Sequence, residues 1–202
     1  MSKKHRIRHH VNPFADQTEH KFDGFDNNRP VLIDIGADRG EFVGQLLDRF
    51  GDEKNFLVLE IRKPLALRLQ NKFEKFNNVV VFDGDATRNF RNLLKPMIDR
   101  QVFIEEIYIN FPDPWFKERH KKRRVINQKF LESIKNWIQK DTTWIFQTDQ
   151  KQLFIETVEL LKKMNYINIE FFDSSPYGAM TKWEKAKVAD RFEINRLKFR
   201  FI

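Results

Sequence analysis

From Pro30 onward, short apolar runs alternate with longer segments whose apolar residues recur every three or four positions. An apolar run of about four to eight residues is typical of a buried strand, and a period of about 3.6 residues is typical of a helix. Strands that alternate with helices pair in parallel, because each helix carries the chain back across the sheet. Residues 31–202 are therefore expected to form one α/β domain with a doubly wound, mostly parallel, seven-stranded sheet.

The strands are expected at Val31–Ile35, Phe56–Ile61, Val79–Phe82, Ile104–Phe111, Trp144–Thr148, Ile167–Phe172 and Phe192–Phe201. The helices are expected at Glu41–Phe50, Pro64–Phe76, Arg88–Ile98, Asn127–Ile138 and Gln150–Met164. Pro96 is expected to break or kink the third helix. A loop is expected between the last two strands, so these two strands are expected to pair antiparallel. Residues 1–30 are polar and basic and indicate an arm with little regular structure.

The charge and the cysteine content limit the classes of function. The net charge of +8 over 202 residues favours a polyanionic partner such as a nucleic acid, although a basic but ordinary soluble protein has comparable odds on charge alone. The absence of cysteine excludes disulfides, thiolate zinc sites and cysteine nucleophiles. No secretory signal and no membrane-length apolar run are found, so we expect a cytoplasmic protein without membrane contact.

A cofactor loop is expected between the first strand and the first helix. Gly36 lies in this loop, where a glycine lets the backbone approach a ligand closely. Asp34, Glu60 and Asp85 fall at the ends of the first three expected strands. Open α/β sheets bind ligands at that edge, where Glu60 is expected to accept hydrogen bonds from ribose hydroxyls. Asp85 is expected to lie where an adenine is read.

The loop favours S-adenosyl-L-methionine over a dinucleotide. Asp38 would place an anion in the path of a pyrophosphate, which needs free backbone amides. A zwitterionic sulfonium cofactor tolerates carboxylates better. The alternative, a nicotinamide-dependent oxidoreductase, would need a fuller glycine loop and an acid–base Tyr or His near the crevice.

The segment Phe111-Pro112-Asp113-Pro114-Trp115 follows the fourth expected strand. Proline fixes φ, so the Pro-Asp-Pro turn is stiff and Asp113 has a defined direction. Cationic residues follow at Lys117, Arg119, Lys121, Lys122, Arg123 and Arg124. They predict a phosphate-binding cluster, with the solvated start of a helix as the alternative.

These motifs resemble those of the bacterial tRNA (guanine-N7)-methyltransferases, class I enzymes that use S-adenosyl-L-methionine on a Rossmann-like fold. The most specific match is Phe111–Trp115 with the cations that follow it. The supporting matches are Arg6–Pro13, Asp34–Gly36, Leu59–Ile61, Asp85–Ala86, Thr148–Asp149 and Thr181–Glu184. In the strand order of that class the first and fourth strands are neighbours, which places the Gly36 loop beside Asp113.

The resemblance implies a role for each matching residue. The cofactor would lie against Asp34, Gly36, Glu60, Asp85 and Asp113, and Asp113 would be the catalytic residue. The substrate contacts would be Lys117, Asp149, Thr181, Lys182, Trp183 and Glu184. The tRNA phosphates would meet Arg119, Lys121, Lys122, Arg123 and Arg124. No metal is expected, and either a monomer or a homodimer is compatible with the sequence.

The chain departs from the family pattern at three places. Asp38 stands where the family carries the middle glycine of the loop, and Asp34 stands where it commonly carries glutamate. Ala186 and Lys187 stand where Arg and Gly usually follow the last motif. Asp38 is expected to crowd the methionine end of the cofactor. A catalytically weak or silent tRNA-binding member of the same fold, or a methyltransferase acting on another RNA base, therefore remains an alternative.

Overall fold

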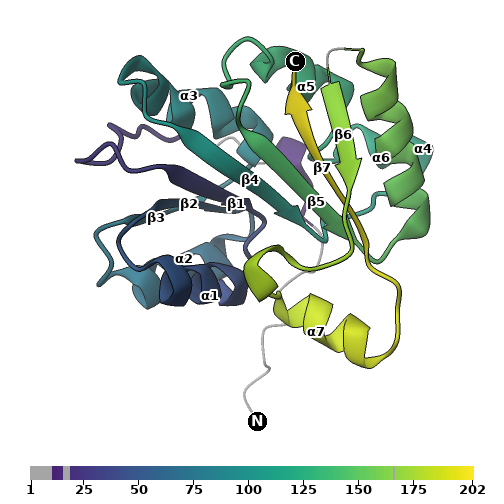
Figure 1. Ribbon diagram of the computed structural model, residues 1–202, viewed down its shortest axis with the longest axis horizontal. Helices are drawn as coiled ribbons and strands as arrows, with labels where there is room; N and C mark the ends of the chain where they lie inside the picture. The colour runs from purple at the N-terminus through teal and green to yellow at the C-terminus, as the bar shows by residue number, and fades with distance from the viewer. Residues whose placement is uncertain (1–10, 16–18, 166) are drawn as a thin grey trace.

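A computed structural model describes residues 11–15, 19–165 and 167–202. Its described residues form a seven-stranded sheet with the order β3-β2-β1-β4-β5-β7-β6 (Figure 1). The strands are β1 Val31–Ile35, β2 Asn55–Glu60, β3 Val79–Asp83, β4 Ile104–Asn110, β5 Thr143–Thr148, β6 Ile167–Phe171 and β7 Asn195–Phe201. The pairs among β1 to β5 are parallel, and β7 is antiparallel to both β5 and β6. The predicted fold class and the antiparallel end of the sheet are confirmed.

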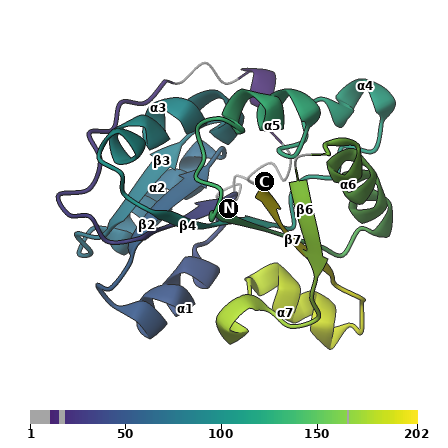
Figure 2. The same ribbon diagram turned by 45° about the horizontal axis from the view of Figure 1, so that its top comes forward.

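The helices form a layer on each face of the sheet. They are α1 Glu41–Phe50, α2 Lys63–Phe73, α3 Ala86–Asp99, α4 Glu118–Lys121, α5 Gln128–Ile134, α6 Lys151–Lys163 and α7 Lys182–Ala189. Apolar side chains of α1 and α2 pack in one core cluster, and those of α3, α5 and α6 pack in the other. Figure 2 shows α3 and α5 on one side of the sheet and α1 on the other.

The central strand β1 is covered by both layers. All five of its residues are buried, which fits its nearly unbroken apolar sequence. Leu32 packs with the α1 and α2 cluster, and Ile33 packs with the α3, α5 and α6 cluster. The side chains alternate between the two faces, as they must in any strand. The sheet is thus fixed from both sides, and β1 and β4 lie next to each other at its centre.

The structure corrects two expectations for the helices. Pro96 lies inside α3 and does not break it, since the helix continues to Asp99, so only the kink expected at Pro96 stays a prediction. A helix, α7, lies where only a loop was expected between the last two strands. The buried residue of α7 is the charged Glu184, so the helix has no buried apolar face that a search for apolar periodicity would detect. Its start follows from Thr181, whose side chain accepts a hydrogen bond from Glu184 N at 3.0 Å.

Part of the arm packs against the domain. Pro13–Ala15 form a short 3-10 helix, and residues 19–30 form no helix or strand. His20 N donates to Asn89 Oδ1 at 2.9 Å, and Phe25 is buried in the core cluster with α3. The motif residues Arg6–His10 lie outside the described residues. Within the described part of the chain, no helix has the length and apolarity needed to span a bilayer.

Candidate active site

A cavity of about 1520 Å³ opens at the carboxyl ends of the parallel strands. Several of the predicted site residues line it: Asp34, Gly36, Glu60, Asp85, Asp113, Arg123, Asp149, Thr181, Lys182 and Trp183. These residues come from segments far apart in the chain. Figure 1 shows α7 beyond the ends of β4 and β5, and Lys182, Trp183 and Ala186 of this helix line the cavity. The cavity is larger than the roughly 300–1,000 Å³ of a typical ligand pocket. It has room for more than one small ligand.

The first loop leaves open space beside its backbone. Gly36 has a φ of +85°, and a Cβ at this position would meet nothing within 4 Å. Gly36 N donates to Leu59 O at 2.8 Å, which holds the loop against β2. Gly40, at φ +66°, differs, because a Cβ there would lie 2.5 Å from Leu69 Cδ2. Gly36 therefore leaves room for a ligand, whereas Gly40 allows close packing of the loop on α2.

Asp34 is a buried carboxyl group with an unpartnered oxygen. It is 4% exposed, and Oδ1 is buried without a hydrogen-bond partner. Burial, reinforced by the nearby charge of Glu60 and opposed by Asn110, raises the pKa of Asp34 to about 7. A cationic group placed beside Asp34 would satisfy this oxygen and favour the ionised form. The site therefore suits a positively charged ligand.

Glu60 already has partners for both carboxylate oxygens. Oε1 accepts from Arg62 N and Nε, each at 2.8 Å, and Oε2 accepts from Asp38 N and Arg62 Nη2, each at 2.9 Å. A carboxylate has about four lone-pair sites, so these four bonds fill them. The predicted contact between Glu60 and a ribose therefore requires Arg62 to shift.

Asp38, which departs from the family pattern, is paired with the same arginine. Its Oδ1 lies 3.0 Å from Arg62 Nη2. Burial acts to lower the pKa of Arg62, but Glu60, Asp38 and Asp113 outweigh it and raise that pKa above its ordinary value. Arg62 thus joins the ends of β1 and β2 electrostatically to the Asp113 turn. Sequence reasoning missed Arg62, although a cation two residues after Glu60 is a readable signal.

Asp85 caps the helix that follows β3. Its side chain accepts a hydrogen bond from Thr87 N at 3.1 Å, and Thr87 Oγ1 donates to the same carboxylate. This capping satisfies one of the free backbone donors at the start of α3. Asp85 also lines the cavity, so the cap fixes the direction of a carboxylate that faces the ligand space.

Asp113 lies in the cavity with Gly36, as the adjacent positions of β1 and β4 require. The residues that flank its two prolines, Phe111 and Trp115, have φ values of 51° and 41°. Phe111 N donates to Gln147 O at 2.8 Å, which ties the start of the turn to β5. The turn therefore brings one carboxylate beside the first loop.

The far wall is held by polar contacts between α7 and the sheet. Asp149, at the end of β5, accepts from Trp183 Nε1 at 3.2 Å and pairs with Lys187 Nζ at 3.1 Å. Glu184 is fully buried and binds Arg196 Nη2 at 2.8 Å. Glu184 does not line the cavity. Its hydrogen bond with Arg196 instead fixes α7 to β7.

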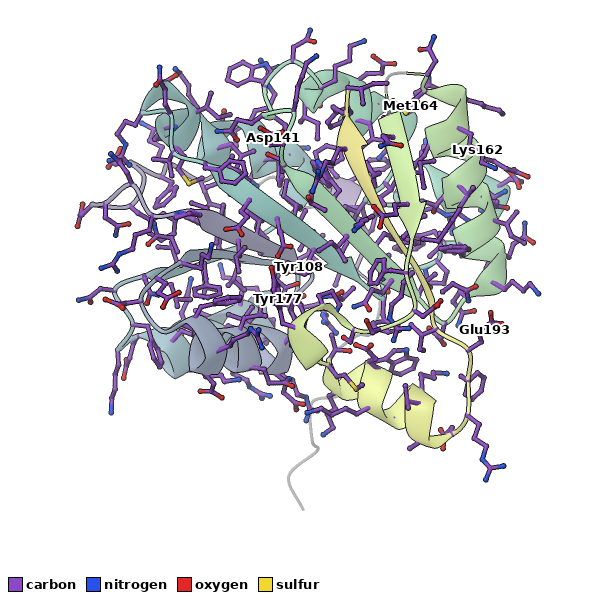
Figure 3. All side chains as sticks on the ribbon, in the orientation of Figure 1. Tyr108, Asp141, Lys162, Met164, Tyr177 and Glu193 are labelled. Atoms are coloured by element: carbon purple, nitrogen blue, oxygen red, sulfur yellow. The ribbon has the colours of Figure 1, made fainter. Side chains whose placement is uncertain are left out.

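A second polar cluster holds the segment before Thr181. Tyr177 Oη lies 3.1 Å from both oxygens of Glu106, and Tyr108 Oη donates to the same carboxylate. Figure 3 shows Tyr108 and Tyr177 close together where β4 meets this segment. Burial is the main cause that raises the pKa of Glu106. Sequence reasoning missed this cluster, because its partners are 71 positions apart.

The cationic segment divides into two sides. Arg119 and Lys122 are exposed, as is Lys117, and none of the three lines the cavity. Lys121 and Arg124 instead form ion pairs with Glu156 of α6. Arg123 lies with its guanidinium carbon 5.0 Å from the centre of the Trp115 ring. Within the described residues, no group of His, Asp or Glu side chains is arranged to hold a metal ion.

Comparisons with known proteins agree with this arrangement. A methyltransferase family (Methyltransf_4) matches residues 28–194. The tRNA (guanine-N(7)-)-methyltransferase of Macrococcus caseolyticus is 31% identical over 91% of this chain and 87% of its own length. The enzyme of the same name from Prochlorococcus marinus is 32% identical, over 93% and 96% respectively.

Solved structures support the fold alone. An antibiotic-related methyltransferase superposes with a TM-score of 0.56 at 18% identity, covering 87% of each chain. A SAM-dependent methyltransferase from Aquifex aeolicus gives 0.53 at 11% identity, covering 87% of this chain and 85% of its own. From the family match and the relatives above 30% identity, the chain belongs to the tRNA (guanine-N7)-methyltransferase family.

Proposed function

We propose that this chain transfers the methyl group of S-adenosyl-L-methionine to N7 of a guanine in tRNA. The observation that carries the proposal is that Asp113 and the Gly36 loop line one cavity. The family resemblance makes the guanine of the tRNA variable loop the specific target and the cytoplasm the location. Asp113 is proposed as the catalytic residue, as its place in the family signature implies.

The residues present fit the cofactor. The unpartnered oxygen of Asp34 suits a cationic ligand, and the open space at Gly36 gives the ligand access to the loop backbone. Asp34, Gly36, Asp85 and Asp113 would hold the cofactor, with Glu60 joining them if Arg62 shifts. When bound, S-adenosyl-L-methionine supplies an electrophilic methyl group on a sulfonium.

Methyl transfer to guanine N7 requires the protein to position the two reactants and to stabilise the charge that develops. Guanine N7 carries a lone pair and no proton, so no base is needed to deprotonate it. Holding the two reactants in line can supply about 7–11 kcal/mol of the barrier reduction. The guanine gains positive charge as the methyl group arrives, and the Asp113 carboxylate stabilises that charge. Asp113 also accepts from the guanine N1–H or amino group, which orients the ring, and Asp149 is a second residue proposed to contact the substrate.

The basic surface supports tRNA as the partner. The exposed Arg119 and Lys122, together with Lys117, are proposed to contact phosphates. Each phosphate contact releases counterions, so tRNA binding should weaken steeply as salt is raised. Thr181, Lys182 and Trp183 line the cavity and are proposed to contact the substrate near the reacting base.

The direct test is a methylation assay. Purified protein is incubated with labelled S-adenosyl-L-methionine and unmodified tRNA transcripts, and the product is mapped by cleavage at N7-methylguanine. The proposal expects one labelled guanine per tRNA. Label on another atom would identify a different methyltransferase, and cofactor and tRNA binding without transfer would identify a silent member of the fold.

Cofactor affinity is expected to rise about tenfold between pH 6 and pH 8, because the pKa of Asp34 is about 7 and a cationic ligand needs the ionised form. The stability of the folded protein changes with pH in the opposite direction. A raised carboxyl pKa contributes stability below the ordinary value, and this contribution is lost as the pH rises through about 7. Calorimetric titration at both pH values checks the affinity, with Asp34→Asn as the control that should show no such rise. Equal wild-type affinity at pH 6 and pH 8 would rule out this role for Asp34.

Gly36→Ala and Gly40→Ala are expected to fail in different ways. At Gly36 the added methyl meets no protein atom, so the free energy of unfolding falls by only about 1–2 kcal/mol, from backbone strain. Cofactor affinity falls as well, because the methyl fills the open space beside the loop. At Gly40 the methyl also meets Leu69 at 2.5 Å, which adds about 1–3 kcal/mol of overpacking. Urea denaturation with cofactor titration separates the two. A Gly36→Ala protein that binds cofactor normally would show that the open space is not used.

A further inference from the structure

The turn that carries Asp113 is strained at both ends. Phe111 and Trp115 have φ values of 51° and 41°, where a residue with a side chain loses about 1–2 kcal/mol. Pro112 and Pro114 between them lack backbone donors and cannot stabilise the turn through their own amides. Such a conformation persists only where the surroundings hold it. The direction of Asp113 therefore depends on what contacts this turn.

Among the described residues, hydrogen bonds from two sides hold the backbone of the turn. The first, from Phe111 N to Gln147 O, ties its start to β5 at 2.8 Å. The second runs from Arg124 Nε to Pro114 O, also at 2.8 Å. It fixes the peptide between Pro114 and Trp115, one residue beyond Asp113. This second bond comes from the cationic segment that the sequence assigns to phosphate binding.

The Arg124 side chain is enclosed and its charge is balanced within the protein. The side chain is 10% exposed, and Nη1 pairs with Oε2 of Glu156 on α6. Lys121 Nζ lies 2.9 Å from the other oxygen of the same carboxylate. Hydrogen bonds from Lys121 and Gln152, together with Arg124, lower the pKa of Glu156 to about 2. Glu156 is thus ionised throughout the neutral range and remains a partner for Arg124.

The spacing of the cations explains the division. Lys121 and Arg124 are three residues apart, and so are Arg119 and Lys122. α4 ends at Lys121, and Arg124 N donates to Lys121 O at 3.0 Å in the turn that follows it. The first pair turns toward α6, whereas the second pair is exposed. The exposed pair has side chains available to an external polyanion. Arg124 instead uses Nε for Pro114 and Nη1 for Glu156, and its Nη2 is buried without a hydrogen-bond partner among the described residues.

We propose that Arg124 is a positioning residue for Asp113, which holds the Pro114 carbonyl while anchored to α6 through Glu156. The planar guanidinium suits this role, because it donates to a carbonyl and to a carboxylate in two fixed directions. The exposed cations, Arg119 and Lys122, are then the residues that bind phosphates. The inference rests on the proposed methyl transfer, since its readout is the turnover of tRNA.

The test compares Arg124→Ala with Arg119→Ala. Each variant is assayed for kcat at saturating tRNA, and for tRNA affinity across a range of salt concentrations. Arg124→Ala should lower kcat by about tenfold to 10²-fold, because a misplaced group near the reacting atoms has that effect. Its tRNA affinity should stay within about twofold of the wild type, with an unchanged salt slope. Arg119→Ala should weaken tRNA binding and reduce the salt slope by about one.

Two further variants separate a positioning role from a loss of folding and from phosphate binding. Arg124→Lys keeps the charge but cannot contact Pro114 and Glu156 in the same geometry, so kcat should still fall. This variant decides the question if circular dichroism shows that Arg124→Ala is unfolded. Glu156→Gln removes the anchor and should lower kcat without tightening tRNA binding. If Arg124 were instead a phosphate ligand restrained by Glu156, that variant would bind tRNA more tightly.

The inference is overturned if Arg124→Lys retains the wild-type kcat, or if Arg124→Ala reduces the salt slope as Arg119→Ala does. The first result would show that the guanidinium geometry does not position Asp113, and the second would make Arg124 a phosphate contact. A wild-type protein that methylates no tRNA would overturn the proposed function instead. The two failures are therefore distinguishable within one set of assays.

Discussion

Replacing Asp113 with alanine is expected to lower the rate of methyl transfer by about 10²–10³-fold while leaving the protein folded. The carboxylate lies in the cavity with the Gly36 loop, where it is proposed to stabilise the positive charge that develops on guanine. Because the prolines on either side shape the turn, removing one side chain between them should not unfold it. Steady-state assays with tRNA transcripts measure the effect, and circular dichroism checks the fold.

Asp141→Ala is the matched control for this experiment. Asp141 is exposed and lies just before β5, at the end of the sheet away from the cavity (Figure 3). The same change of residue there should leave turnover within about twofold of the wild type, as most exposed substitutions do. The turnover of Asp113→Asn should lie between those of the wild type and Asp113→Ala, because asparagine keeps the shape of the side chain but loses its charge. Wild-type turnover by Asp113→Ala would refute the catalytic role of this residue.

The second large effect is expected at Arg62. Arg62→Ala should lower the free energy of unfolding by about 3–5 kcal/mol, because it leaves the fully buried Glu60 without its cationic partner. Cofactor affinity should fall although Glu60 is freed for the ribose, because Asp38 loses its ion pair at the cavity wall and its unpaired carboxylate crowds the methionine end of the cofactor. Urea denaturation and cofactor titration measure the two effects.

Arg29→Ala gives the comparison for Arg62. Arg29 pairs with Asp52 at the surface, where the two side chains are 42% and 81% exposed, so its loss should change stability by at most about 1 kcal/mol. Adding Asp38→Gly to Arg62→Ala should recover part of the cofactor affinity, because it removes the unpaired anion and restores the family's glycine. Equal stability of the Arg62→Ala and Arg29→Ala proteins would mean that the buried network contributes little.

The sequence predicted the sheet because its strands carry strong local signals. Val31–Ile35 is apolar except for Asp34, and the structure buries it on both sides as such a pattern requires. Helix α7 was missed because its buried residue is Glu184, a charged residue that apolar periodicity does not count. Only the pairing of Glu184 with Arg196 on β7 makes that burial possible, and pairing between distant residues has no local signature.

In the candidate site too, contacts between residues far apart in the chain could not be predicted from the sequence. Residues such as Asp34 and Asp113 were found because each lies at a strand end, where the topology places ligands. The partners of these residues were harder to find. The role of Arg62 depends on the buried position of Glu60, and that of Arg124 depends on Glu156, which lies 32 residues away. A run of cations predicts phosphate binding for every member, whereas packing turns some members inward.

Asp113 and the methyl donor are proposed to share the cavity at the carboxyl ends of β1 and β4. A crystal structure with S-adenosyl-L-homocysteine bound tests it most directly. We expect the sulfur to lie between the Gly36 loop and the Asp113 carboxylate, with the adenosine toward Glu60 and Asp85. A ligand bound elsewhere, or excluded by Asp38 with Asp113 turned away from it, would show that Asp113 and the methyl donor do not share one cavity.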